Sequence, residues 1–428
     1  MEEKRTLRQR LALMAAVVGP GIITANVDND AGGIATYSIA GAHFGYTLIW
    51  SLIPIAISLV VIQEMCNRMG VITGKGLSAL IRERFGVKPI FYILLALLFT
   101  NLGNILAEFA GIAASVDILM LGGSGAEHTS LQYALRQFAV IAAAVFVWLL
   151  LLKGTYKSVE RIFLGACVFY VSYIIAGVLA KPDWNQVAAE TIYPLRGLKP
   201  GIVPSAYLIM LVGLIGTTIA PWMQFYQQAS VAEKGIHMED YAYSKLDTYL
   251  GGILVNVVAF FIIVLCGATL YQNHVRVETA DQAANALAPL AGKYCSYLFA
   301  FGLLNASLFA ASILPLSTSY SVCEGLGWES GVDRSFADAP HFYTIYTVLI
   351  LCGAGTIFIP PDKLVGVMLV SQVINGLMLP LVLIFMLRLA NDPEIMGKFV
   401  NNRFQNGICV LTITLVVVSS VAAIVQLF

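Results

Sequence analysis

Charged residues are scarce in this chain. Asp, Glu, Lys and Arg make up 12% of its 428 residues, whereas soluble domains have roughly 25%. The 25 basic residues balance the 25 acidic ones, so no strong field of one sign favours nucleic acid as a partner. The chain has only seven cysteines, mostly in apolar runs, and no CxxC pair. This spacing excludes a disulfide framework and a zinc site, and it predicts small buried thiols.

Apolar residues dominate instead. They make up 58% of the chain, and the mean hydropathy is +0.80. If the chain were soluble, its length would suggest about three domains, but this composition indicates an integral membrane protein. The first ten residues, MEEKRTLRQR, are charged and lead into a long apolar stretch. No short apolar region with a cleavage site follows, so we expect no cleaved signal peptide.

The apolar stretches are long enough to cross a bilayer as helices, which takes about 20 residues. They are continuously apolar and lack period-two alternation, which excludes a β-barrel. The sequence therefore predicts an all-α membrane protein with about eleven transmembrane helices. The expected spans are 11–42, 46–69, 89–121, 134–153, 160–180, 203–233, 246–271, 296–323, 341–359, 364–389 and 406–427.

The basic residues predict the topology. With the N-terminus in the cytoplasm, 18 of the 25 Lys and Arg residues lie in cytoplasmic segments and seven lie outside. This asymmetry follows the positive-inside rule. It supports a cytoplasmic N-terminus, an external C-terminus and an odd number of spans. If one helix were omitted, every later loop would change sides and the asymmetry of Lys and Arg would be lost.

The first span carries polar residues where a membrane helix should be apolar. It reads GPGIITANVDNDAGGIATYSIAG, with Asn, Asp and Gly concentrated at 26–33. These residues are poor in helix interiors, and an Asp at the bilayer centre costs about 2.5–3.5 kcal/mol on the insertion scale. We therefore expect the helix to be broken at 26–33, where its backbone is buried or lines a wet cavity.

The sixth span has a second interruption, at 216–221, which reads GTTIAP. Pro221 removes a backbone donor and frees the carbonyl of Thr217. Broken first and sixth helices predict five-plus-five inverted repeats with a substrate site between the breaks. We therefore expect one transmembrane domain over 1–428, with repeats at 1–180 and 203–389 and an eleventh helix at 406–427.

Asp28 and Asp30 bring negative charge to the first break, and the unwound backbone adds carbonyl oxygens. Hard oxygen donors with carboxylates suit a cation. Single kinks from Pro or Gly are common in membrane helices, but two breaks five helices apart favour a transport site. Asp28 has a second interpretation, because it could face water or cap a half-helix. Gln372, in the tenth span, reads equally well as a ligand and as a contact between helices.

Four motifs in order resemble the NRAMP family of divalent-metal transporters, and the resemblance covers most of the chain. Asp30-Ala31-Gly32-Gly33 falls on the family's Asp-Pro-Gly-Asn signature, and 216–222 falls on the sixth-helix motif that ends Met-Pro-His. The loop after the second helix is similar at 70–74, as are the tenth helix and its following loop at 371–373, 379–380 and 396–401. The resemblance implies the leucine-transporter fold with eleven helices.

Residue by residue, the resemblance implies an altered metal site. Only the signature Asp is retained, as Asp30. The ligand Asn falls on Gly33, where a glycine permits a positive φ, and the ligand Met falls on Ala220. The family's carbonyl donors map to Val27 and Thr217, and its tenth-helix Gln maps to Gln372.

The positions of the family's proton route are also altered. Its sixth-helix His falls on Trp222, and its third-helix acidic pair falls on Asn101 and Asn104. All three positions are therefore neutral, although Glu108 and Asp117 remain elsewhere in the third helix. This pattern is similar to the NRAMP-related magnesium transporters, a prokaryotic branch of the family. It implies transport without proton coupling, with Glu108 or Asp28 as the alternative route.

The altered site predicts the transported ion. Replacing a soft thioether by Ala220 removes a preference for late transition metals, and Mg²⁺ retains several waters beside one or two carboxylates. We expect transport of partly hydrated Mg²⁺, and of Mn²⁺, through a prokaryotic inner membrane. The metal ion and the lipid bilayer are then the partners, with no cofactor, nucleic acid or obligatory protein partner.

Four other functions are weighed against this one. A proton-coupled Mn²⁺ or Fe²⁺ transporter shares the family motifs, and a cation-coupled symporter of organic solutes shares the fold. An intramembrane serine protease would use the GGSG of 122–125 and His128, but Gly and Ser are ordinary in a short turn. A scaffold protein would need an extramembrane domain, which the sequence does not offer.

Overall fold

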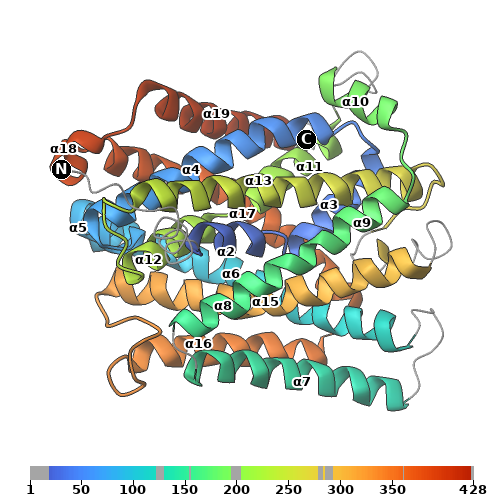
Figure 1. Cartoon of the computed structure of the whole chain (residues 1–428), viewed down its shortest axis with the longest axis horizontal. Coiled ribbons are helices and arrows are strands. Elements are labelled where there is room, and N and C mark those ends of the chain that lie inside the picture. The colour runs from blue at the N-terminus through green and yellow to red at the C-terminus, as the bar shows by residue number, and fades with distance from the viewer. Residues whose placement is uncertain are drawn as a thin grey trace, which may run out of the picture.

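A computed structural model describes residues 19–121, 130–153, 156–193, 204–277, 283–284, 293–359 and 361–425. All regular structure in these ranges is helical, as the sequence predicts, and the long helices run side by side in one bundle (Figure 1). The Gly-Ser turn and His128 of the protease interpretation lie outside these ranges.

The long helices coincide with the predicted spans. Nine of those described are long and apolar enough to cross a membrane, counting the two halves of the sixth span as one. Eight of the nine are α4 (Leu52–Thr73, preceded by η1, Ile49–Ser51), α6 (Val87–Leu121), α7 (Ser130–Lys153), α13 (Tyr241–Cys266, extended by η3, Gly267–Tyr271), α15 (Lys293–Leu326), α16 (Pro340–Ala354, extended by η4, Gly355–Phe358), α17 (Pro361–Ala390) and α19 (Arg403–Val425).

The fifth span is bent. Its membrane part is α8 (Tyr156–Cys167), a turn η2 (Val168–Tyr170) and α9 (Val171–Leu179). A further helix, α10 (Trp184–Ile192), turns away from it by 108°. Asp183 caps α10, because its carboxylate accepts hydrogen bonds from the backbone of Asn185 and Gln186. Three short elements connect the remaining helices: α5 (Leu77–Phe85), α18 (Pro393–Met396) and η5 (Gly397–Phe399).

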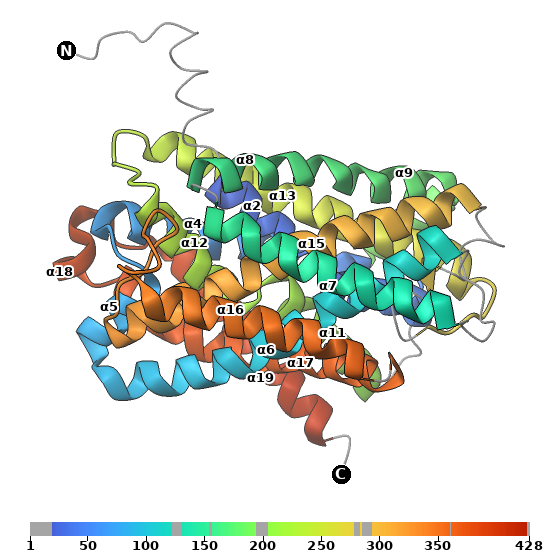
Figure 2. The same cartoon turned by 90° about the horizontal axis from the view of Figure 1, so that it is seen from below.

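The first span consists of two half-helices, α2 (Pro20–Val27) and α3 (Ala31–Phe44), in the middle of the bundle (Figures 1 and 2). Neither half alone is long enough to span a bilayer. With the bent fifth span, they complete the eleven predicted spans. The break is narrower than predicted, since only 28–30 lie outside the two helices. Asp30 begins α3 because its carboxylate caps the amide of Gly33, a role for which Asp is well suited.

The sixth span is broken at Ile219 and Ala220, between α11 (Ser205–Thr218) and α12 (Pro221–Glu233). This interruption is also narrower than the predicted 216–221. Pro221 occupies the first turn of α12, where a missing N–H costs nothing.

The half-helix α2 approaches α13 closely enough for backbone contact at two glycines, and a carboxylate of α13 binds its first amides. The carboxylate of Asp247 accepts hydrogen bonds from the amides of Gly21 (2.6 Å) and Ile22 (3.2 Å). A Cβ on Gly21 would lie 2.5 Å from the amide nitrogen of Thr248, and a Cβ on Gly251 would lie 2.5 Å from the carbonyl oxygen of Gly21. The free amides at the start of α2 therefore find their hydrogen-bond acceptor on a helix more than 200 residues away in the sequence.

Candidate metal site

Oxygen atoms converge at Gly33, in the first turn of α3. A Cβ at this position would lie 2.5 Å from the carbonyl oxygen of Asp28 and 3.2 Å from both Asp30 Oδ1 and Thr217 Oγ1. We call this space, defined by Asp28, Asp30, Gly33 and Thr217, the oxygen cradle. It lies between the two helix breaks, because Thr217 is the penultimate residue of α11. With glycine at this position no side chain enters the cradle, and the three nearest atoms are all hard oxygens.

Gly33 has a different role from the one expected. It is not among the residues with positive φ, and it lies inside the regular helix α3. The expectation that glycine serves a left-handed conformation there is therefore wrong. The reason for glycine is steric, since any side chain would enter the oxygen cradle.

Two carboxylates meet the N-terminus of α3. Asp30 Oδ1 accepts a hydrogen bond from the amide of Gly33 at 2.6 Å, and Glu108 Oε2 accepts one from the amide of Ala31 at 3.0 Å. Both acids are buried, with at most 3% of their surface exposed. The positive end of the α3 dipole stabilises negative charge at this position. Glu108 thus belongs to the site, whereas the sequence pointed to it only as an alternative proton route.

Several buried polar atoms near the breaks make no hydrogen bond of ordinary geometry among the described residues. They are both side-chain oxygens of Asp28, both polar side-chain atoms of Asn29, Glu108 Oε1 and Asn375 Oδ1. Unsatisfied buried polar groups are rare and usually contact water or an ion. Within the described ranges, no three His, Cys, Asp or Glu side chains are grouped to hold a metal. A cation bound here would therefore use few carboxylates together with amide, hydroxyl and carbonyl oxygens.

The structure brings most of the predicted ligands together. The Gln372 amide packs directly on Gly32, and its Oε1 accepts a hydrogen bond from Asn375. Val27 ends α2 and Ala220 precedes α12, so each is buried at its break. Neither side chain offers a donor atom. Asp28, Asp30, Thr217 and Gln372 are thus the predicted positions that present polar side chains between the breaks.

The three positions of the family's proton route are buried and neutral. Trp222 packs near Tyr226, and the Asn101 amide donates a hydrogen bond to Thr318 at 2.8 Å. Asn104 is fully buried with neither side-chain polar atom hydrogen-bonded in the described part of the chain. It lies one helical turn before Glu108, on the same face of α6. Among the residues of α6, the acid that contacts the break before α3 is therefore Glu108.

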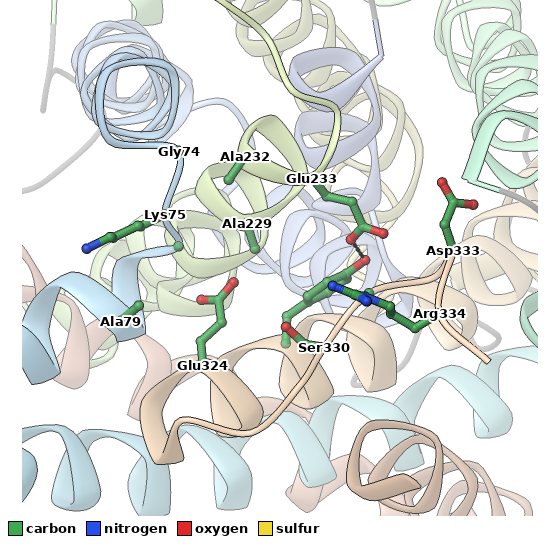
Figure 3. Close-up of a pocket in the computed structure, with 13 residues that line it drawn as sticks. Gly74, Lys75, Ala79, Ala229, Ala232, Glu233, Glu324, Ser330, Asp333 and Arg334 are labelled. Atoms are coloured by element: carbon green, nitrogen blue, oxygen red, sulfur yellow. Dashed lines mark hydrogen bonds between the residues drawn. The ribbon is translucent and has the colours of Figure 1, made fainter. Parts of the chain in front are cut away.

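A second polar region lies at the far end of α12. A cavity of about 600 Å³ is lined by Glu233 of α12, Tyr320 and Glu324 of α15, and Lys75 and Arg334 from two loops (Figure 3). The Glu233 carboxylate accepts hydrogen bonds from the Tyr320 hydroxyl and the backbone of 332, so it holds the loop against the bundle.

This cavity is separate from the oxygen cradle. Thirteen residues of α12 lie between Ala220 and the end of the helix, which at 1.5 Å per residue is about 20 Å. The sequence analysis did not predict the cavity. The acidic residues of the cavity lie near the ends of apolar spans, where charged residues are common in any membrane protein. The composition of the sequence therefore does not indicate the cavity.

Helices broken in the first and sixth spans around a buried polar centre define a multi-pass integral membrane protein with the leucine-transporter fold. A manganese transporter of Eremococcus coleocola superposes with a TM-score of 0.75, at 21% identity, over 98% of this chain and 88% of that one. MhsT, solved in complex with L-phenylalanine, matches with a TM-score of 0.58 at 11% identity over 99% of both chains. At these identities the likenesses establish the fold alone.

Sequence comparisons establish the family. The model of the Nramp family, described as natural resistance-associated macrophage protein-like, matches residues 21–426. A divalent metal cation transporter MntH of Erwinia tasmaniensis is 25% identical over 97% of this chain and 95% of its own length. MntH 1 of Pseudomonas aeruginosa is 28% identical over 93% and 88%. The chain therefore belongs to the Nramp family.

Proposed function

We propose that this protein transports divalent metal ions, chiefly Mg²⁺ and also Mn²⁺, as partly hydrated ions by alternating access. The observation that carries the proposal is the oxygen cradle at Gly33, where the three atoms nearest to a Cβ position are all hard oxygens. Relatives of the chain are named divalent metal cation transporters, which supports divalent metal ions as the class of substrate. The ion is the substrate, and the proposal requires no cofactor.

The choice of Mg²⁺ follows from the donor chemistry of the cradle. Mg²⁺ dehydrates reluctantly and usually keeps several waters beside one or two carboxylates. Gly33 and Ala220 carry no side chain larger than a methyl group, so neither position adds a ligand that would replace one of those waters. Asp30 supplies the charge, while Thr217 and the carbonyl of Asp28 supply neutral oxygens. Soft ions gain little from such a donor set.

Competition for Mn²⁺ uptake tests this proposal. In proteoliposomes loaded with a divalent-sensitive dye, excess Mg²⁺ is expected to suppress Mn²⁺ uptake, because both ions use the same oxygen donors. Cd²⁺ at equal concentration is expected to compete poorly. If wild type ignores excess Mg²⁺, the magnesium assignment fails and a transition-metal carrier is the better account.

Glu108 favours a second candidate, a proton-coupled Mn²⁺ or Fe²⁺ transporter. It is a buried carboxylate in contact with the α3 terminus beside Asp30, and intramembrane acids often belong to proton relays. Against this candidate, Trp222, Asn101 and Asn104 leave no titratable chain along the family's proton route. We therefore retain uncoupled transport as the proposal.

An internal pH dye distinguishes the two candidates. For uncoupled transport, the internal pH stays constant during Mn²⁺ uptake, and Glu108→Gln, whose amide oxygen can still accept from Ala31, leaves the dye signal unchanged. Acidification that depends on metal and disappears in Glu108→Gln would establish coupling through this residue. Protein-free liposomes given the same metal are the control.

The distribution of Lys and Arg supports a cytoplasmic N-terminus and an external C-terminus in a prokaryotic inner membrane. In this orientation the cavity in Figure 3 opens toward the cytoplasm, because the loops that line it fall on the cytoplasmic side of the predicted topology. The repeats at 1–180 and 203–389 would then face each other across the oxygen cradle.

A further inference from the structure

Two hydroxyl groups connect the broken helices directly. Tyr37 of α3 and Thr218, the last residue of α11, form a hydrogen bond of 2.8 Å between side chains 181 positions apart. Both residues are fully buried, with no exposed surface. Thr218 directly follows Thr217, whose hydroxyl lines the oxygen cradle.

Tyr37 lies on the face of α3 that carries Gly33. It follows Gly33 by four residues, so the two share one face of α3. Long side chains on a helix lean toward its N-terminus, which directs the Tyr37 ring over Gly33 toward the break. The hydrogen bond to Thr218 confirms that the hydroxyl reaches the end of α11.

The same hydroxyl lies near the Asp28 side chain, close enough for an electrostatic interaction. Neither Asp28 side-chain oxygen has a hydrogen bond of ordinary geometry within the described residues. A hydroxyl has one proton to donate and two lone pairs to accept. If Thr218 donates to Tyr37, the Tyr37 proton is directed at Asp28 or at a water between them. Such a chain of hydrogen bonds is polarised along its length.

We propose that Tyr37 and Thr218 determine ion specificity by holding the water shell of the transported ion. The two hydroxyls and the Asp28 carboxylate form an outer-sphere contact set beside the direct donor Asp30. This inference rests on the proposed function, since it concerns the same ion site. It assigns the Asp28 carboxylate to the waters of the ion, whereas the Asp28 carbonyl oxygen remains a direct donor.

The contact set discriminates between ions that keep their waters and ions that release them. Water bound to Mg²⁺ is a strong hydrogen-bond donor that requires fixed acceptors, and Mg²⁺ retains several such waters. Mn²⁺ has a less strict demand for hydration, so more of its binding comes from direct contact with Asp30 and the carbonyl oxygens. Removing an outer-sphere acceptor should therefore weaken Mg²⁺ more than Mn²⁺.

Tyr37→Phe removes the hydroxyl and leaves the ring in place. The concentration of Mg²⁺ that halves Mn²⁺ uptake is expected to rise about fivefold, the factor that one hydrogen bond contributes, while the KM for Mn²⁺ changes less than about twofold. Thr218→Val should give the same phenotype. The double variant should show no further shift, since both changes remove one shared network.

The matched control is Tyr346→Phe. Tyr346 is also a buried tyrosine, and its hydroxyl donates a hydrogen bond of 3.1 Å to the carbonyl oxygen of Val147, in helices away from the breaks. The Tyr346→Phe variant should leave both the inhibition by Mg²⁺ and the KM for Mn²⁺ unchanged. Equal changes for Mg²⁺ and Mn²⁺ in Tyr37→Phe, no change at all, or additive effects with Thr218→Val would each overturn the inference.

The result is separable from the proposed function. If Asp30 proves dispensable, the ion site itself is misplaced and the proposed function fails. If Asp30 is essential but Tyr37→Phe matches wild type for both ions, only the outer-sphere role of Tyr37 and Thr218 fails.

Discussion

Asp30→Ala is expected to abolish Mg²⁺ and Mn²⁺ uptake, with at least about a hundredfold loss, while the protein remains folded. Asp30 Oδ1 is the carboxylate oxygen that lines the oxygen cradle. Removing one member of a buried charge pair costs about 3–5 kcal/mol, and every 1.4 kcal/mol is about tenfold in affinity. The measurement is initial uptake into proteoliposomes, with folding checked by size-exclusion profile and thermal unfolding.

Asp30→Asn separates the charge from the structural role of this residue. Asparagine caps helices about as well as aspartate, so its amide oxygen should still accept from Gly33 and hold α3. Uptake should nevertheless be lost, because the neutral amide does not compensate a divalent charge. Asp338→Ala, at an exposed loop carboxylate bonded only to Ser335 among the described contacts, is the control. Near-normal uptake by Asp30→Asn would remove the site assignment.

Ala220→Met is expected to reverse the order of competition between Mg²⁺ and Cd²⁺. Ala220 lies buried at the break before α12, so a Met side chain there would bring a thioether to the ion. A soft sulfur favours Cd²⁺, and its volume displaces water that Mg²⁺ retains. We expect a shift of about tenfold in the ratio of half-inhibitory concentrations, equivalent to about 1.4 kcal/mol.

The control for this variant is Ala232→Met, on the same helix but in the wall of the distant cavity. It should leave the order of competition unchanged. Adding Gly33→Asn to Ala220→Met is expected to strengthen the preference for Cd²⁺ and Mn²⁺ at a cost in stability, because a Cβ at Gly33 lies 2.5 Å from the carbonyl oxygen of Asp28. Unchanged competition in Ala220→Met would mean that residue 220 does not face the ion.

The sequence predicts the spans well because burial in lipid requires continuous apolar runs. It places their ends less well. The helix α4 continues to Thr73 and α13 begins at Tyr241, several residues beyond the hydropathy estimate. Hydropathy reports the hydrocarbon layer, whereas a helix ends where its backbone is capped, as at Gly74 with its left-handed φ of 62°. The breaks are narrower than predicted for the same reason, since Asp30 and Pro221 each begin a helix.

The site is only partly readable from the sequence. Asp30 is predictable because an intramembrane carboxylate is costly and needs a purpose. The place of Glu108 beside Asp30 is not, because its contact with Ala31 joins residues 77 positions apart. Tyr37 and Thr218 look like ordinary residues of apolar helices, and only the fold brings their hydroxyls together. Gly33 was predicted as a position, but the steric reason for it required the neighbouring oxygens.

The contact between α2 and α13 has a mechanical consequence. Gly21 meets Thr248 and Gly251 through main-chain atoms, with no room for one added carbon on either glycine. The Asp247 carboxylate of α13 also accepts hydrogen bonds from two amides at the start of α2. The N-terminal half of the first span is therefore coupled to α13, and any displacement of α2 that leaves α13 in place must first separate Asp247 from these amides.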